Sequence, residues 1–460
     1  MKLLSRVAVG REAAHPIRVL QFGGGNFLRA FADYLIQILN EETDFDGGVA
    51  LVKPTARGDY ASLRQQDGLF HVLTQGIHEG QPVRAIKRVE CIQQIVHPYQ
   101  NWAAYASTAT LPEIRFILSN TTEAGIAFRE EPMPADGPAK EFPGKLTQWL
   151  FHRFQHFEGG EDKGLIFLPC ELIEQNGQEL KHCILKYSRH WNLDASFESW
   201  IEDHNIFCNT LVDRIVPGAP ANAAEIWSET GWEDHELVTA EPYLLWAIEA
   251  PEQVKRELPF DQTRQNVVFT DDLNRFRTLK VRILNGAHTA MVPVGLTNGV
   301  QTVREFVEHP QWGAWLTDLL QKEIAPTLPF GTQEIQDYIV AIIDRFRNPY
   351  IHHKLSDIAL NSTSKFRVRL LPTAIAYHQK MNTSPEHIAQ SLAALILLYK
   401  GDIAGLPRDS EEAVKFFEAC WALKTPDFIV DKVLSNKGIW GEDIRFLSAS
   451  VHQCLQSMQD

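Results

Sequence analysis

An amine, a carboxamide and an imidazole lie within nine residues of one another, at Lys280, Asn285 and His288. The stretch follows an acidic, turn-like pair at 271–272 and continues as an apolar run to Val292, which predicts a helix. At about 100° per residue, Asn285 lies roughly 140° and His288 roughly 80° from Lys280 around the helix axis. The three side chains therefore share one side. There the lysine could exchange a proton while the other two groups hydrogen-bond the oxygens of a substrate.

A solvent-facing polar stripe with a hydrogen-bonded histidine fits the same residues equally well. Along a regular helix Lys280 and His288 are about 12 Å apart. Their polar ends converge only if the lysine bends toward a pocket or the helix starts irregularly. Gly286 lies between the polar residues, and a glycine inside a helix costs about 1 kcal/mol relative to alanine. We therefore expect another group to approach the backbone closely at this position.

Composition excludes several classes of partner. A chain of 460 residues is long enough for two domains, and the formal charge of −14 argues against nucleic acid and anionic membranes as partners. The start of the chain lacks an apolar stretch of signal-peptide length, and no apolar run reaches membrane-spanning length. The cysteines are scattered without a C-x-x-C pair, which is typical of reduced thiols. We expect a soluble, cytoplasmic protein.

A glycine-rich turn near the start of the chain predicts a nucleotide site. Residues 17–22 form a strand candidate, Gly23, Gly25 and Asn26 follow, and residues 27–36 continue as a helical run. This layout presents helix N-terminal amides to a pyrophosphate. The third glycine of G-x-G-x-x-G would fall at Leu28, so an ordinary tight turn remains open as an alternative.

Further strand candidates lie at residues 49–52, 114–118 and 165–170. After the first of these an acidic residue would hold the adenosine ribose of NAD, but Lys53 stands there and favours tolerance of a 2′-phosphate. Thr122 and Glu123 follow the second strand, where open α/β sheets bind ligands. A helix-terminal charge is an equally good interpretation of Glu123.

Beyond residue 271 the pattern changes to amphipathic helices, for example at 334–345, 388–399 and 413–423. The sequence thus predicts an α/β protein. It has a Rossmann-like dinucleotide-binding domain at 1–270 and a mainly α-helical C-terminal substrate and catalytic domain at 271–460. The paired His352 and His353 could suggest a metal, but neighbours on a helix point apart, and we expect no metal.

Lys280, Asn285 and His288 match the K-x4-N-x2-H signature of the polyol-specific long-chain dehydrogenases, the mannitol dehydrogenase-like family. The chain resembles this family over nearly its whole length. Its G-x-G-x-F-x-R fingerprint also fits at the glycine-rich turn. The resemblance implies metal-independent hydride transfer with NAD(H), with Lys280 as acid–base catalyst. The expected cofactor contacts are Phe22, Gly23, Gly25, Asn26, Phe27, Arg29, Lys53, Thr122 and Glu123.

Two other segments resemble family motifs. Residues 209–215 match N-S-M-V-D-R-I, which implies that Asp213 lines the active site and that Arg214 is its structural ion-pair partner. Residues 170–177 keep part of C-D-N-I-x-x-N-G, but Glu171 and Leu172 replace its acidic residue and substrate-side asparagine. These departures argue against a polyol-type hydroxyl contact from this loop, and we expect Cys170 to serve packing.

The third region combines family motifs with positive charge. Residues 345–349 match R-F-x-N-P and residues 361–365 resemble D-G-S-x-K, while Asp357 replaces a mannitol-type arginine. The basic residues concentrated there are Arg345, Arg347, Lys354, Lys365, Arg367 and Arg369. A solvated helix face would explain several of them. A buried substrate carboxylate would need such cations.

Within the family, the chain most resembles members that act on sugar acids. The resemblance implies a substrate carboxylate, for which Lys365 and then Arg345 are the expected contacts. Two alternatives stay open: a mannitol- or fructuronate-type dehydrogenase, and a non-catalytic NAD-binding regulator. The sequence does not determine the oligomeric state or the physiological direction of the reaction.

Overall fold

The computed structural model describes residues 1–11, 15–122, 124–403, 405–422 and 426–459. The chain divides into two compact units. The first unit contains residues 1–75 and 83–273, and the second contains residues 76–82 and 274–460. The sequence placed the boundary at 270. The grouping of 76–82, the tip of a hairpin in the first half of the chain, with the second unit is a long-range association that local periodicity does not encode.

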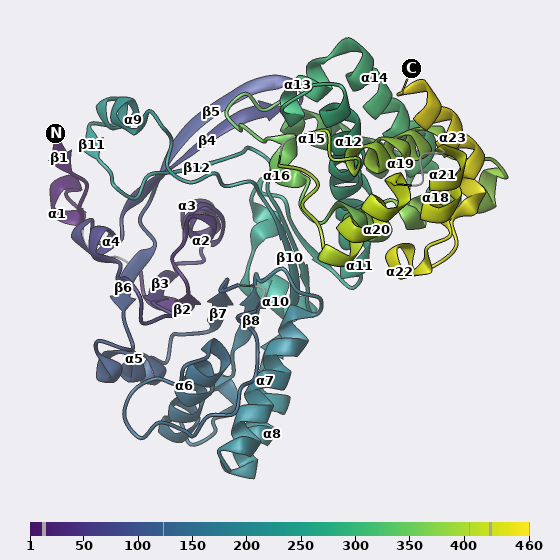
Figure 1. The fold of residues 1–460 in the computed structure, drawn as a ribbon. Coiled ribbons are helices and arrows are strands. Elements are labelled where there is room, and N and C mark those ends of the chain that lie inside the picture. Colours follow the sequence, from purple (N-terminus) through teal and green to yellow (C-terminus); the bar gives the residue numbers. More distant parts are fainter. Residues whose placement is uncertain (12–14, 123, 404, 423–425, 460) are drawn as a thin grey trace. The chain divides into compact units, whose positions relative to one another are not determined.

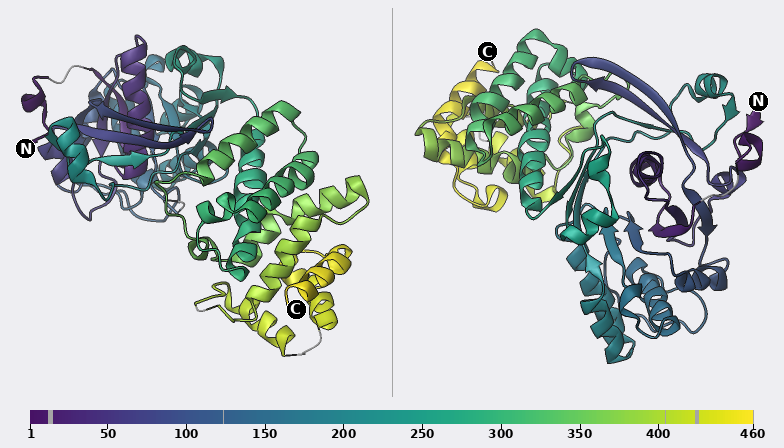
Figure 2. Two further views of the ribbon diagram at one scale, coloured as in Figure 1. Left: turned by 90° about the horizontal axis from the view of Figure 1, so that it is seen from above. Right: turned by 180° about the vertical axis from the view of Figure 1, so that it is seen from behind.

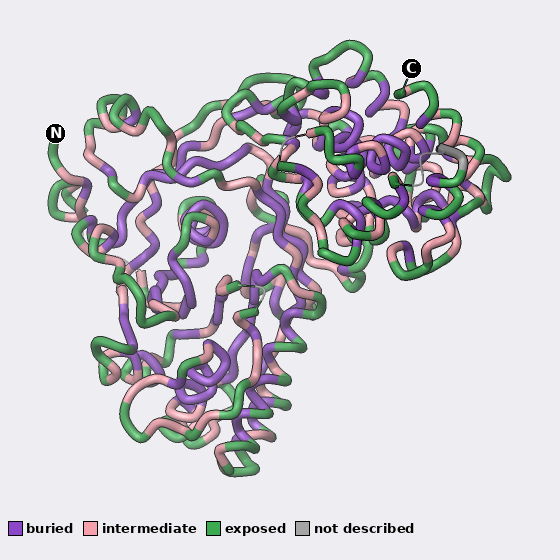
Figure 3. The backbone as a smooth tube through the Cα atoms, viewed as in Figure 1, coloured by how far each residue is buried: buried purple, intermediate pink, exposed green. Residues whose placement is uncertain are grey.

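The main sheet of the first unit is parallel, and its strands run in the order β6-β3-β2-β7-β8-β9. Their bounds are β2 (Ile17–Phe22), β3 (Gly48–Val52), β6 (Ile92–Val96), β7 (Phe116–Ser119), β8 (Ile166–Pro169) and β9 (Ile206–Phe207). Numbered among themselves, these strands have the 3-2-1-4-5-6 order of a doubly wound dinucleotide-binding sheet. β3, β7 and β8 are buried along their whole length (Figure 3), which explains why they read as continuous apolar runs.

Helices connect the parallel strands (Figure 1). They include α2 (Asn26–Leu28), α3 (Tyr34–Glu42), α4 (Ala61–Gln65), α5 (Trp102–Ser107), α6 (Phe142–His156), α7 (Asn176–His190) and α8 (Ala195–Asp203). Between α2 and α3 the helix passes through a π-helical turn (Arg29–Asp33). Two apolar clusters of buried residues, one containing Leu51 and Phe116 and the other Leu20 and Trp149, hold this unit together.

Smaller sheets complete the first unit. β12 (Val238–Ala240) pairs in parallel with β4 (Phe70–His78), which neighbours β5 (Gln81–Val89). β10 (Asn209–Asp213) pairs with β13 (Leu245–Glu249), which pairs with β14 (Val267–Thr270). β1 (Lys2–Leu3) pairs with β11 (Trp232–Glu233). The short helices here are α1 (Arg6–Val9), α9 (Ala223–Thr230) and α10 (Glu252–Glu257).

The second unit is built mainly of helices, which Figure 2 shows in green to yellow from two further sides. The helices are α11 (Leu273–Leu279), α12 (Gly286–Thr297), α13 (Val303–Glu308), α14 (Pro310–Asp318), α15 (Thr332–Phe346), α16 (Leu355–Ile358), α17 (Ser362–Arg369), α18 (Leu371–Met381), α19 (Glu386–Leu398), α20 (Glu411–Trp421), α21 (Pro426–Leu434), α22 (Lys437–Trp440) and α23 (Ser448–Ser457). α12 packs against α16, α17 and α19 in one large apolar cluster. The predicted fold class, a Rossmann-like domain followed by a mainly helical region, is confirmed.

Within the described part of the chain, no helix is long and apolar enough to cross a membrane. The same residues contain no cluster of three or more His, Cys, Asp and Glu side chains placed to hold a metal ion.

Candidate active site

The chain turns sharply at the end of β2, where Gly23 has φ +112°, a conformation that glycine adopts without strain. A Cβ at Gly23 would lie 3.1 Å from the carbonyl oxygen of Asn120, just beyond β7. The Gly23 N–H donates to the carbonyl of Val52 at 3.1 Å, which ties the turn to the end of β3. The turn is therefore wedged between the ends of two neighbouring strands, where any side chain would displace it.

Tyr60 fixes the next residue of the turn. The Gly24 N–H donates to the Tyr60 hydroxyl at 2.8 Å, and a Cβ at Gly24 would lie 2.8 Å from Leu51. Burial raises the pKa of Tyr60 to about 12, so the hydroxyl keeps its proton near neutral pH. Sequence reasoning missed Tyr60 because it lies in an irregular connection 36 residues farther along the chain, with no periodic signal.

Gly25 leaves room for a ligand. It has an extended conformation and precedes the first residue of α2, and a Cβ built on it meets no heavy atom of the described chain within 4 Å. The unbonded N–H groups at the start of a helix favour an anion. This open backbone at a helix start, next to two sterically fixed glycines, fits the pyrophosphate of a dinucleotide.

Other residues predicted to contact the cofactor instead have partners within the protein. Phe22 is buried, and its ring centroid lies 4.9 Å from that of Phe142, so its side chain belongs to the core. Arg29 is 6% exposed and forms an ion pair with Glu236 at 2.6 Å. It also donates to Asn26 Oδ1 at 2.8 Å. The Arg29 guanidinium, expected at the cofactor, is therefore paired with a carboxylate of the protein.

The phenyl ring of Phe27 stacks on Phe31 with centroids 5.0 Å apart. At the end of β3, Lys53 Nζ donates to Thr55 Oγ1 at 2.7 Å and lies 5.4 Å from the centre of the Tyr60 ring. Burial lowers the pKa of Lys53. Lys53 thus lies at the strand end expected to select the ribose, with its ammonium group bonded locally.

The loop after β7 contains Thr122, which is exposed and accepts at its carbonyl from the Gly125 N–H at 2.8 Å. Glu123 lies outside the described residues. The preceding residue of the loop, Thr121, donates to the carboxylate of Glu171 through its N–H at 2.9 Å and through its hydroxyl at 3.0 Å. Glu171 therefore anchors this loop to the end of β8, although burial raises its pKa.

The other residues that we named in the loop after β8 lie in different environments. Asn176 donates to the carbonyls of Pro169 and Thr210 at 2.9 and 3.1 Å, which joins β8 to β10. Leu172, in place of the family's asparagine, is 63% exposed. Cys170 is fully buried, and burial raises the pKa of its thiol well above the usual value, so it contributes packing and no thiolate.

Asp213 is the last residue of β10 and is 6% exposed. The next residue, Arg214, donates through Nη1 to the Ala30 carbonyl at 2.5 Å and through Nε to the Glu241 carbonyl at 3.1 Å. Its guanidinium also lies 4.8 Å from the centre of the Tyr34 ring. Arg214 therefore holds the π-helical turn Arg29–Asp33, a contact that the motif match did not indicate.

In the second unit, the helix that contains Lys280, Asn285 and His288 differs from the regular helix that the sequence predicts. α11 ends at Leu279, residues Lys280–Asn285 form a π-helical turn, and α12 begins at Gly286. A π turn bonds residue i to residue i+5. Asn285 therefore lies nearly over Lys280 and not about 140° away, as an α-helix would place it. Sequence periodicity could not show this, because a single π turn inserts one residue without changing the apolar pattern on either side.

Gly286 packs in the ordinary way. A Cβ there would lie 3.6 Å from Leu370 Cδ2 and 3.7 Å from both the Arg369 carbonyl oxygen and Ile324 Cδ1. These are normal van der Waals distances, so the inference of an unusually close approach at this glycine is wrong. The described part of the chain gives no steric reason for a glycine at this position.

His288 contacts the ring of Phe346, the last residue of α15, and the ring of His353 in the irregular segment that follows. Its centroid is 4.6 Å from that of Phe346 and 5.1 Å from that of His353, which meets it edge-on. Burial lowers the pKa of His353. His352 and His353 lie in an irregular segment, not on a helix as we had assumed. Sequence reasoning considered His353 only as a metal ligand and missed this ring contact.

The candidate carboxylate contacts occupy different environments. Lys365 on α17 is half-buried and donates through Nζ to the Ile358 carbonyl at 2.8 Å. Burial, and then Arg369, lower its pKa. Arg345 is only 5% exposed, in the last turn of α15. The neighbouring Asp344 accepts from the Gly80 N–H at 3.0 Å. Lys365 is therefore the more accessible of the two cations.

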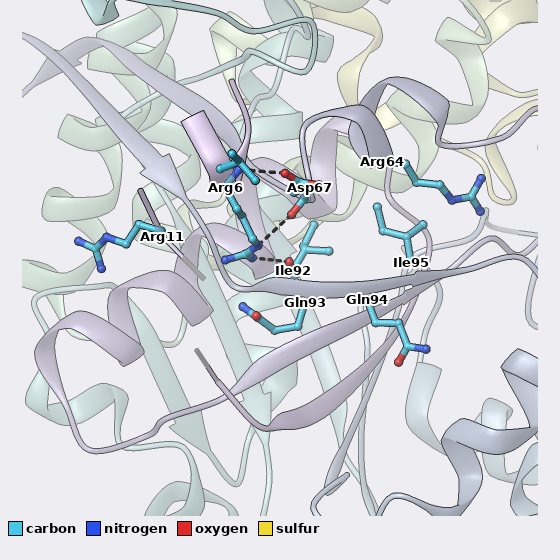
Figure 4. Close-up of a pocket in the computed structure, with 10 residues that line it drawn as sticks. Arg6, Arg11, Arg64, Asp67, Ile92, Gln93, Gln94 and Ile95 are labelled. Atoms are coloured by element: carbon cyan, nitrogen blue, oxygen red, sulfur yellow. Dashed lines mark hydrogen bonds between the residues drawn. The ribbon is translucent and has the colours of Figure 1, made fainter. Parts of the chain in front are cut away.

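A pocket of about 430 Å³ in the first unit contains none of these residues (Figure 4). Arg6 lines this pocket, and the N–H groups of Arg6 donate hydrogen bonds within the protein. Its backbone N–H donates to Asp67 Oδ2 at 3.0 Å and its Nη2 to the Ile92 carbonyl at 2.8 Å. Arg11 and Arg64 point away from each other at its two ends.

Family models decide the classification of this architecture. The mannitol dehydrogenase Rossmann domain matches residues 17–262, and the mannitol dehydrogenase C-terminal domain matches residues 272–460. The chain belongs to the mannitol dehydrogenase family. The Rossmann match also makes a dinucleotide the cofactor of this family member.

Similar members of the family share one name. The altronate oxidoreductase of Bacillus subtilis (strain 168) is 41% identical over 96% of this chain and 92% of its own. That of Yersinia enterocolitica is 39% identical over 97% and 94%.

Two solved structures share the fold. Pseudomonas fluorescens mannitol 2-dehydrogenase, in a ternary complex with NAD and D-mannitol, has a TM-score of 0.67 at 21% identity, covering 100% of this chain and 97% of its own. A substrate-free D-sorbitol dehydrogenase has a TM-score of 0.79 at 20% identity, covering 100% and 98%.

Proposed function

We propose that this chain is an NAD-dependent oxidoreductase that interconverts D-tagaturonate and D-altronate in hexuronate catabolism. The carrying observation is the difference in similarity within the family. Altronate oxidoreductases are 38–41% identical over nearly the full chain, whereas the mannitol and sorbitol enzymes of known structure are 20–21% identical. An uncharged polyol needs no cation for binding, whereas a sugar acid does. The basic residues of the 345–369 region therefore support the same substrate class.

Three residues of the second unit have different roles in the proposed reaction. When bound, the nicotinamide supplies or accepts the hydride. Lys280 gives a proton to the oxygen of the reduced carbon and takes one in the reverse direction. Asn285 and His288 hydrogen-bond the reacting oxygen and its neighbour, which orients the ketone. The π turn supports this division because it stacks Asn285 and Lys280 on one side of the helix.

NAD(H) is the proposed cofactor in preference to NADP(H). An NADP site needs a free cation for the 2′-phosphate, whereas Lys53 is bonded to Thr55 and lies against Tyr60. The far end of the substrate carries a carboxylate, and Lys365 is its proposed partner, with Arg345 second. Asp213 is also proposed as a substrate contact.

The cellular setting is also part of the proposal. The six cysteines are free thiols, which supports a cytoplasmic location. The proposed partner is a small sugar acid, with no nucleic acid or membrane.

The test uses the reverse reaction. With D-altronate and NAD, the wild type should form NADH, which is measured by the absorbance of the reduced nicotinamide. The Lys280→Ala variant should lose about 10²–10⁴-fold in turnover. Its NADH affinity should change little, because Lys280 is proposed to act on the substrate oxygen. Unchanged turnover in the variant would show that Lys280 does not take part in the mechanism. If the wild type oxidises D-mannitol in preference to D-altronate, the sugar-acid assignment is wrong and the chain acts on polyols.

A further inference from the structure

A buried carboxyl lies directly behind the glycine-rich turn. Asp33 ends the π-helical turn Arg29–Asp33 and is fully buried, as is Gln21 on β2. The Gln21 side-chain amide donates to the Gly23 carbonyl at 3.1 Å and to Asp33 Oδ2 at 3.2 Å. One amide group thus connects the carboxyl to the first glycine of the turn.

This connection reaches the part of the turn that is hardest to deform. Gly23 has φ +112°, and its N–H already donates to the end of β3. The Gln21 contact fixes the orientation of its carbonyl and so of the peptide plane that leads to Gly24 and the open Gly25. A change at Asp33 is therefore transmitted through Gln21 to the backbone that faces the cofactor.

The Asp33 carboxyl has too few donors to remain ionised easily. Asp33 Oδ1 and Gln21 Oε1 are buried and have no hydrogen-bond partner among the described residues. A buried carboxylate with one neutral donor is costly. Burial raises the pKa of Asp33 to about 7, with the Gln21 hydrogen bond and the charge of Arg29 opposing that rise.

Three groups around Asp33, the Cys91 thiol, Arg214 and Tyr60, have pKa values well above neutrality. The Cys91 thiol donates to the Asp33 carbonyl at 3.3 Å, and burial raises the pKa of that thiol well above its usual value. Burial lowers the pKa of Arg214 to about 10 and raises that of Tyr60 to about 12. Arg29 is paired with Glu236, and Glu241 accepts from the Ile215 N–H at 2.6 Å.

We propose that Asp33, acting through Gln21, is a positioning residue for the anionic cofactor: in its neutral form it holds the glycine-rich turn ready, and its ionisation weakens dinucleotide binding. The cofactor brings negative charge to the other side of this turn, and a like charge disfavours a carboxylate. By linkage, binding takes up a proton at Asp33, and affinity falls as pH rises through its pKa. The inference rests on the dinucleotide cofactor of the proposed function but not on the identity of the sugar acid.

The test measures NADH binding to the full-length protein by fluorescence titration, without sugar, between about pH 6 and pH 8. Wild-type affinity should weaken about tenfold over this range, as for one group titrating near the middle of it. Asp33→Asn removes the titration and keeps a partner for Gln21, so its affinity should change less than about twofold over the range. Glu257→Gln is the matched control, because Glu257 is a carboxylate of the same unit paired with Arg115, and its pKa is lowered.

Gln21→Leu provides a second variant that cuts the connection and leaves Asp33 in place. It should bind NADH more weakly than the wild type at low pH and lose the pH dependence. A wild-type affinity that is constant with pH, or a pH dependence that persists in both Asp33→Asn and Gln21→Leu, would overturn the inference alone. A wild type that binds no NADH at all would overturn the proposed function together with it.

Discussion

The π turn at Lys280–Asn285 makes an unusual prediction for changes of chain length. A π turn is equivalent to one extra residue in an α-helix. Deleting Val281, which is half-buried, should return this turn to an α-helix in which Lys280 precedes Asn285 by four residues. Residues four apart lie about 40° from each other around the helix, so Lys280, Asn285 and His288 should stay on one side.

Inserting an alanine after Val281 has the opposite effect. With no second π turn to absorb it, the insertion rotates Lys280 by about 100° relative to Asn285. At a radius of about 5–6 Å for the side chains, this rotation displaces the lysine tip by about 8 Å. It also turns the buried Leu279 out of the core, at a cost of about 2 kcal/mol in the free energy of unfolding.

Turnover of altronate by the two variants and by Lys280→Ala separates these expectations. The insertion should fall to the level of Lys280→Ala, about 10²–10⁴-fold below the wild type. The deletion should remain at least about tenfold more active than the insertion, with some loss from small displacements. Circular dichroism and thermal melting establish that both variants are folded. A folded deletion variant as inactive as the insertion, or an active insertion, would refute the role given to the π turn.

Three further predictions concern charge. NADH should give a higher kcat/KM than NADPH, and the reverse preference would show that Lys53 binds a 2′-phosphate. Lys365→Met should lower kcat/KM for tagaturonate by about 30-fold, or about 2 kcal/mol. This is the lower end of the range for a broken buried charge pair, because Lys365 is only half-buried, and fructose reduction should change far less. Because the pKa of Asp33 is raised from 3.8 to about 7, its stabilising contribution is present at acid pH and is lost as pH rises toward 7. Relative to Asp33→Asn, chemical denaturation should show the wild type losing up to about 4 kcal/mol between pH 4 and pH 8, and parallel profiles would contradict this.

The parallel sheet was predictable because its strands are buried on both faces and read as apolar runs. Residues 17–22 coincide with β2, and residues 49–52 lie within β3. The glycine-rich turn was predictable because Gly23 must adopt a positive φ. The helices predicted beyond residue 271 appear as α15, α19 and α20. α15 and α20 have the expected amphipathic pattern, whereas α19 is buried on nearly all sides.

The parts that escaped prediction depend on contacts between distant segments. Gly24 meets Tyr60, Arg214 meets Ala30, and His288 meets His353 across separations of tens of residues or more. Such pairings leave no periodic signal. The π turn escaped for a different reason: its effect is a change of angle within one helix, which assumed α-helical geometry hides.

The substrate itself is the most direct test of the account. Wild-type protein is supplied with NADH and, in separate assays, with tagaturonate, fructuronate and fructose, and kcat/KM is measured from NADH oxidation. The account predicts that tagaturonate exceeds fructose by about 30-fold or more, the worth of a carboxylate held by a partly buried cation. It also predicts that tagaturonate exceeds fructuronate. Equal or better reduction of fructose would contradict the sugar-acid assignment and place the chain among the polyol dehydrogenases of its family.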